Sequence, residues 1–121
     1  EYIEDWLPKA SPEAVKKVLV DVLEQCFILD QMKVNKEEMH NPLKHIIIDA
    51  KNMPVLIDFE RCYETEKPHN VTQFVDFIGK RQKLLLKKGF AFGLKELREA
   101  AVKYKQTYGE KEFEAMVGLL R

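Results

Sequence analysis

The stretch EMHNPLKHIIIDAKNMPVLIDFE, residues 38–60, decides the fold. It contains two short runs rich in isoleucine and valine, at 45–49 and 55–58, and the polar segment 50–54 lies between them. Short strands are typically bounded by turn residues, and Asn52 tolerates the left-handed backbone angles that a tight turn requires. The sequence therefore predicts a β-hairpin here.

The chain on both sides of the hairpin has the three-and-four spacing of apolar residues that is typical of helices with one buried face. We expect helices over residues 2–7, 12–32, 70–88, 94–108 and 113–120. Ser11 is a good N-cap for the second helix, and Asn70, with Gln73 three residues later, is the expected cap of the third. The charged, aperiodic segment 60–69 predicts a loop. The expected fold is mainly α with one small β-hairpin, in a single domain over 1–121.

The composition narrows the class of protein. Twenty Lys and Arg residues balance twenty Asp and Glu residues in a chain of 121, so no overall charge attracts nucleic acid or an anionic membrane. The longest apolar runs, at 46–48 and 84–86, are far shorter than the roughly 20 residues of a membrane span. We expect Cys26 and Cys62 to be reduced thiols, which favours a cytoplasmic location.

The segments 38–49 and 55–60 resemble the catalytic and metal-binding loops of protein kinases. In that family a polar loop leads into a short strand, and after a turn a second strand ends in an Asp-Phe pair, here Asp58 and Phe59. His40 lies 18 residues and His45 lies 13 residues before Asp58. These steps match the family's spacing between the catalytic Asp, the catalytic-loop Asn and the metal-binding Asp.

The similarity is strongest to the predicted Ser/Thr protein kinases of archaea, which are related to the RIO-type atypical kinases. Residues 1–7 resemble the segment just after a kinase hinge, and residues 12–32 resemble the long helix before the catalytic loop. The resemblance implies a helical C-terminal lobe, and the absent N-terminal lobe, with its Gly-rich loop and Lys, is the expected partner. The chain opens at Glu1 without an initiator methionine, and we expect this lobe alone to be inactive.

The resemblance also implies a reaction, the transfer of the ATP γ-phosphoryl group to a Ser or Thr hydroxyl with Mg²⁺ as the metal. Asp58 is the implied Mg²⁺ ligand, and Glu60 replaces the family's glycine and offers a second carboxylate. The alternative for Asp58 is that it only caps the turn after its strand.

The remaining site residues depart from the family's pattern. His40 stands at the position of the catalytic Asp, so the general base is either His40 or Glu38. His45 stands at the position of the Asn that holds a second Mg²⁺, although histidine is a poor ligand for this hard cation. Lys44 is placed where it can reach a phosphate of ATP.

These departures leave two other functions open. One is a pseudokinase that binds nucleotide or a partner and acts as a scaffold. The other is a non-catalytic helical adaptor that binds nucleic acid or an acidic partner. Its basic stretch consists of Lys80, Arg81, Lys83, Lys87 and Lys88. The competing interpretation of this stretch is that its cations complement the C-terminal end of a helix.

Overall fold

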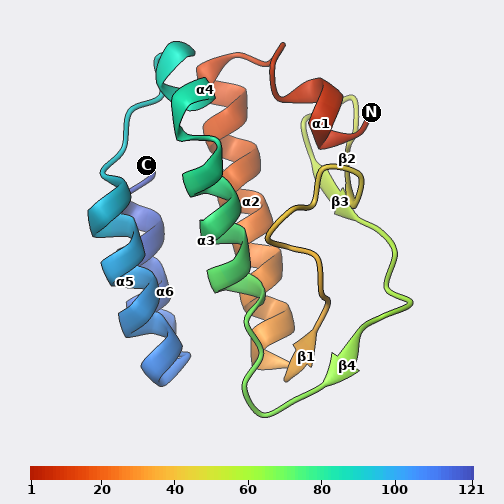
Figure 1. The fold of residues 1–121 in the computed structure, drawn as a ribbon, viewed down its shortest axis with the longest axis vertical. Coiled ribbons are helices and arrows are strands. Elements are labelled where there is room, and N and C mark those ends of the chain that lie inside the picture. The colour runs from red at the N-terminus through yellow and green to blue at the C-terminus, as the bar shows by residue number, and fades with distance from the viewer.

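The computed structural model describes all 121 residues and contains six helices and two pairs of strands. Figure 1 shows how they are arranged. The helices are α1 (Ile3–Trp6), α2 (Pro12–Gln31), α3 (Asn70–Lys80), α4 (Gln82–Lys87), α5 (Leu94–Thr107) and α6 (Glu110–Gly118). The strands are β1 (Val34–Asn35), β2 (Ile46–Ile48), β3 (Pro54–Leu56) and β4 (Tyr63–Glu64). The mainly helical class that the sequence predicts is therefore confirmed. None of these helices combines the length and the apolar character that crossing a membrane requires.

The long helix α2 is the centre of the fold. Ser11 caps it, because the Ser11 hydroxyl accepts a hydrogen bond from the Ala14 N–H at 3.1 Å, and Pro12 occupies the first turn. One side of α2 packs against α3, and the layer continues from α3 to α5 and from α5 to α6 (Figure 1). The two strand pairs lie on the other side of α2 and α3. The apolar faces of these helices form one core of 27 buried residues.

The predicted hairpin is present as β2 and β3. The strands pair antiparallel, with Ile47 opposite Val55, and the Ile57 N–H extends the ladder by donating to the His45 carbonyl at 3.0 Å. The turn is held by the Asp49 carboxylate, which accepts two backbone N–H groups, and Asn52 adopts the expected left-handed angle with φ of 59°. This ladder fixes His45 beside the residues that follow β3.

The prediction of a single strand pair is incomplete, because β4 lies inside the segment 60–69 that the sequence predicts as a loop. β4 pairs with β1, and Asn35 lies opposite Tyr63. Each of these strands is two residues long, which is too short to show the alternation of apolar and polar residues that predicts a strand. The second pair draws the segment after β3 alongside the end of α2 (Figure 1).

The single helix expected over 70–88 is two helices. It breaks at Arg81, where the backbone leaves helical angles and the Arg81 N–H is shared between the Phe77 and Ile78 carbonyls. The predicted N-cap is also wrong: His69 precedes the first turn of α3, and Asn70 is a helical residue whose side chain is fully buried. Asn70 turns its amide away from its own helix and toward α2 and β1.

A buried polar network joins four of the elements. The Asp30 carboxylate at the end of α2 accepts the Asn70 side-chain amide at 2.8 Å and the Tyr104 hydroxyl of α5 at 2.8 Å. The Asn70 amide also donates to the Val34 carbonyl at 2.7 Å, and its oxygen accepts the Lys36 N–H at 2.8 Å. Burial raises the pKa of Asp30, and the hydrogen bonds from Tyr104 and Asn70 oppose that shift.

We expect Asn70→Ala to lower the free energy of unfolding by about 2–4 kcal/mol, because it leaves several buried polar groups without a partner. Urea unfolding followed by circular dichroism measures the change. Asn41→Ala is the matched control, because Asn41 is exposed and we expect less than about 0.5 kcal/mol there. Equal effects of the two substitutions would contradict a structural role for the Asn70 network.

Candidate functional site

A small cavity lined only by polar side chains lies between the end of β1 and the end of the hairpin. Its volume is about 170 Å³. We call it the polar cavity, and its lining residues are Lys36, Glu38, His45, Asp58, Glu60 and Arg61. Three separate stretches of chain supply them: the segment after β1, the residue before β2 and the segment after β3. A cavity that concentrates titratable groups from distant parts of a chain is a candidate functional site.

The backbone around the polar cavity is held in uncommon conformations. Glu37, Glu38 and Asp58 have φ angles of 71°, 64° and 63°, in the left-handed region that residues other than glycine seldom occupy. Such conformations persist only where the surroundings impose them, and they cluster at functional sites. Here the surroundings are the β1–β4 ladder on one side and the hairpin on the other.

Glu38 connects the ionisable groups of the polar cavity. One Glu38 oxygen lies 2.5 Å from His45 Nε2, and the other accepts a hydrogen bond from Arg61 at 2.9 Å. The second His45 nitrogen, Nδ1, is buried and lies 3.3 Å from an Asp58 oxygen without the geometry of a hydrogen bond. His45 therefore stands between two carboxylates that belong to different loops.

Lys36 is the most unusual residue of the polar cavity, because it is charged and only 1% exposed. Its ammonium donates one long hydrogen bond, 3.5 Å, to the Asp58 carbonyl and lies 5.1 Å from the centre of the Phe59 ring. No carboxylate oxygen lies within 4.0 Å of it. Burial lowers the pKa of Lys36, and the charges of Asp58 and Glu38 partly oppose that shift.

The structure brings together four of the six site residues expected from the sequence. Glu38, His45, Asp58 and Glu60 all line the polar cavity. The other two, His40 and Lys44, are exposed and do not belong to its lining. Of the two candidate bases, only Glu38 is therefore placed beside Asp58 and His45.

Sequence reasoning missed two residues of the polar cavity. From the sequence, Arg61 is an unremarkable charged residue next to Glu60 in a segment that predicts a loop, and a solvated pair with Glu60 is the default interpretation. In the structure its guanidinium donates a hydrogen bond to Glu38 instead. Lys36 lies before the stretch that resembles the kinase loops, so the resemblance does not include it. The sequence gives only a weak indication of its role, which is that Lys36 lies two residues before Glu38 in a short polar segment between two apolar regions.

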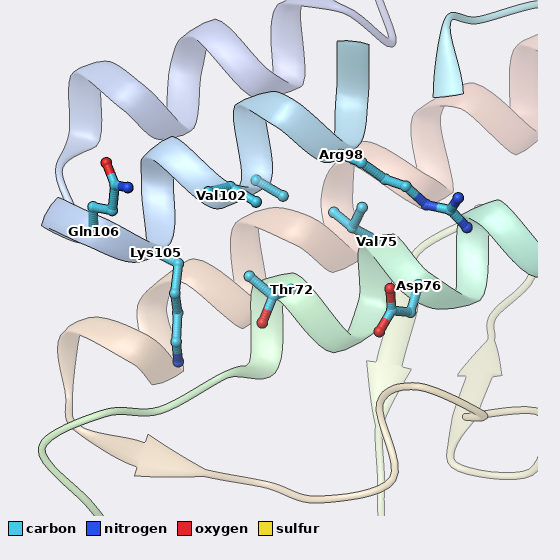
Figure 2. Close-up of a pocket in the computed structure, with 8 residues that line it drawn as sticks. Thr72, Val75, Asp76, Arg98, Val102, Lys105 and Gln106 are labelled. Atoms are coloured by element: carbon cyan, nitrogen blue, oxygen red, sulfur yellow. The ribbon is translucent and has the colours of Figure 1, made fainter. Parts of the chain in front are cut away.

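A larger hollow of about 470 Å³ lies between α3 and α5 (Figure 2). Figure 2 shows Thr72, Val75 and Asp76 projecting from α3, and Arg98, Val102, Lys105 and Gln106 from α5. Asp76 and Arg98 make no ion pair, and the Lys105 ammonium is committed to the Pro68 carbonyl at 2.5 Å. Because its ionisable groups are spread along the rim and do not contact one another, we place the candidate site at the polar cavity.

The two thiols differ in environment and are not joined to each other. Cys26 is fully buried in the core face of α2, and burial raises the pKa of its thiol. Cys62 is exposed and follows Arg61 directly. Only Cys62 is accessible to reagents in solution.

No three His, Cys, Asp or Glu side chains are grouped closely enough to hold a metal ion by themselves.

Comparison with known proteins does not indicate a function, because no protein-family model, no curated protein and no solved structure matches this chain. The residues of the polar cavity and their geometry are therefore the observations from which a function is inferred.

We expect Lys36→Met to raise the free energy of unfolding by about 1–2 kcal/mol, because methionine keeps an unbranched chain but removes a buried charge that has one weak acceptor. Urea unfolding at pH 7 measures the change. Lys44→Met, at an exposed position, is the control and should shift stability by less than about 0.5 kcal/mol. A loss of stability in Lys36→Met would mean that Lys36 is a structural residue.

Proposed function

We propose that this chain is the catalytic-loop lobe of a protein-kinase-like phosphotransferase, which transfers the γ-phosphoryl group of ATP to a Ser or Thr hydroxyl when it is joined to an N-terminal lobe. The observation that carries the proposal is the convergence of Glu38 and Asp58 around His45. Two carboxylates from different loops, each on a left-handed backbone, face one small cavity. With both thiols unpaired, we place this activity in the cytoplasm.

The polar cavity has the chemistry to hold Mg²⁺ together with phosphate oxygens. Asp58 and Glu60 supply carboxylate oxygens, which Mg²⁺ prefers, and Mg²⁺ in nucleotide sites commonly uses one or two carboxylates plus phosphates and waters. Asp58 and Glu60 would hold the ion, and the phosphates of a bound nucleotide would supply further oxygen ligands. At about 170 Å³ the cavity suits a phosphate group and its metal, while the nucleoside must lie outside it.

Glu38 is the best-placed general base. In the proposed step the acceptor hydroxyl oxygen forms a bond to the γ-phosphorus, the bond from that phosphorus to the bridging oxygen breaks, and ADP departs. Glu38 takes the hydroxyl proton, while Arg61 and His45 hold its two oxygens in place. Mg²⁺ held by Asp58 and Glu60 would supply neutralisation of the charge on the transferred group. Positioning supplies most of the rate enhancement in such reactions.

The outer face of the hairpin offers a surface for the nucleoside or for a second lobe. Tyr2 bridges to Ile47, which pairs with Val55, so the three side chains share one face of the ladder. Tyr2 and Val55 are 40% and 47% exposed, whereas Ile46 and Ile48 on the opposite face are buried. This apolar strip adjoins the end of the hairpin that carries His45.

The pseudokinase scaffold remains the alternative within the same fold. It is motivated by His40, His45 and Glu60, which stand where a kinase has the catalytic Asp, the catalytic-loop Asn and Gly. It predicts nucleotide binding without Mg²⁺ dependence, and so the binding experiment that tests the kinase proposal also separates the two.

We expect the full-length natural protein to bind ATP in calorimetry only when Mg²⁺ is present, and Asp58→Asn to weaken that binding by at least about tenfold through loss of a metal ligand. Asparagine suits the left-handed angle of Asp58, so the substitution preserves the loop. Asp76→Asn, an exposed site on α3, is the control that should bind as wild type. Binding that ignores Mg²⁺ would favour the pseudokinase, and no ATP binding at all would refute both proposals.

A second candidate function, the helical adaptor, is favoured by the unpaired cations around the break between α3 and α4. Lys80, Arg81 and Lys83 line a hollow of about 410 Å³ that α1 closes. None of the five basic residues of this stretch forms an ion pair, and Lys88 donates to the Pro8 carbonyl. This surface is suited to nucleic acid or to another anionic partner.

We expect an adaptor to bind single-stranded RNA with an affinity that falls steeply with salt. Replacing three exposed lysines, Lys80, Lys83 and Lys87, by alanine should reduce the log–log salt slope by about 2, since each lost phosphate contact removes roughly 0.7. Fluorescence anisotropy across a salt series measures the slope. The same replacement at Lys95, Lys103 and Lys111 is the control, and equal slopes in both variants would count against an adaptor surface at α3 and α4.

A further inference from the structure

The ammonium of Lys36 has hydrogen-bonding capacity that the protein does not use. A lysine ammonium has three donors, and a buried charge is costly unless its donors are satisfied. At 1% exposure Lys36 makes one hydrogen bond, 3.5 Å long, and no ion pair within 4.0 Å. Its backbone is fixed by Asn70, and the Phe59 ring lies over its ammonium, so the side chain is held toward the cavity that it lines.

We propose that Lys36 binds a phosphate oxygen of a ligand that enters the polar cavity as a complex of a divalent cation with a polyphosphate. This inference rests on the proposed phosphotransferase function and deepens it by naming the form of the ligand and the residue that recognises its anionic part. It also reassigns the phosphate contact from Lys44, which is exposed and outside the cavity lining, to Lys36.

The charges of the polar cavity favour that complex over either of its parts. Glu38, Asp58 and Glu60 face Lys36 and Arg61, so the cavity carries one net negative charge when His45 is neutral. A free polyphosphate is repelled by the carboxylates. A free divalent cation is opposed by the buried ammonium of Lys36, which forms no ion pair within 4.0 Å. A metal complex of a polyphosphate presents its cation to the carboxylates and its oxygens to Lys36.

Arg61 does not compete for this role. Its guanidinium is already paired with Glu38 at 2.9 Å, and its side chain is 78% exposed. Lys36 is therefore the cation of the cavity that has both a buried position and free donors. A hydrogen bond between an ammonium and a phosphate oxygen is charge-assisted, and such bonds are stronger than those between neutral groups.

The test compares two probes on the full-length natural protein, Mn²⁺ alone and Mn²⁺ complexed with pyrophosphate, with the bound metal measured by electron paramagnetic resonance. We expect Lys36→Met to weaken binding of the manganese–pyrophosphate complex by about tenfold or more, through loss of a charge-assisted hydrogen bond. The same variant should bind Mn²⁺ alone as tightly as wild type or more tightly, because a repelling charge is gone. Lys44→Met should match wild type for both probes.

A merely structural lysine would weaken the binding of both probes on substitution. Weaker binding of the complex together with unchanged or tighter binding of Mn²⁺ alone therefore identifies the phosphate contact. Unchanged affinity of Lys36→Met for the complex overturns the inference, even if Asp58→Asn abolishes binding and thereby supports the metal site. If Asp58→Asn binds both probes as wild type while Lys36→Met loses the complex, the phosphate contact stands and the metal assignment fails. Absence of any binding of the complex to wild type refutes the inference.

Discussion

The buried carboxylate of Asp30 is the constraint on which the rest of the structure depends. Removed from water at the end of α2, it needs donors, and Asn70 and Tyr104 bring α3 and α5 to it. Asn70 also fixes the segment at β1, because its amide oxygen accepts a hydrogen bond from the Lys36 N–H and its amide nitrogen donates one to the Val34 carbonyl. One buried side chain, that of Asn70, therefore connects the helical core to the polar cavity and fixes the backbone position of Lys36.

Much of the fold could be predicted from sequence, because the apolar spacing of the long helices and the isoleucine-rich runs of the hairpin are local signals. The failures concern residues whose local pattern fits two structures. The sequence predicts Asn70 as an N-cap, since asparagine commonly begins helices. Its side-chain amide instead forms hydrogen bonds with residues that are 34 to 40 positions away along the chain. The β1–β4 pair is too short to show any alternation, and its register, with Asn35 opposite Tyr63, follows from the packing of its neighbours.

The candidate site was predicted in part for a related reason. The spacing of the hairpin segments correctly groups His45 with Asp58, because a hairpin brings residues near its two ends together. This spacing does not determine which side chains of the loop before β2 face the cavity. Glu37 and Glu38 adopt left-handed angles in that loop, and in the structure Lys36 lines the cavity while the later Lys44 is exposed. Such angles are uncommon outside glycine, and nothing in the local sequence announces them.

The contrast between the two cysteines gives the molecule a built-in attachment point for a spectroscopic probe. Cys26 is sealed in the core and its thiol is held protonated, whereas Cys62 is open to solvent next to Arg61. A maleimide dye would therefore label one position without any engineered residue. Cys62 directly follows Arg61, a lining residue of the polar cavity, so a dye attached there would lie next to the loop that a ligand of the cavity must contact.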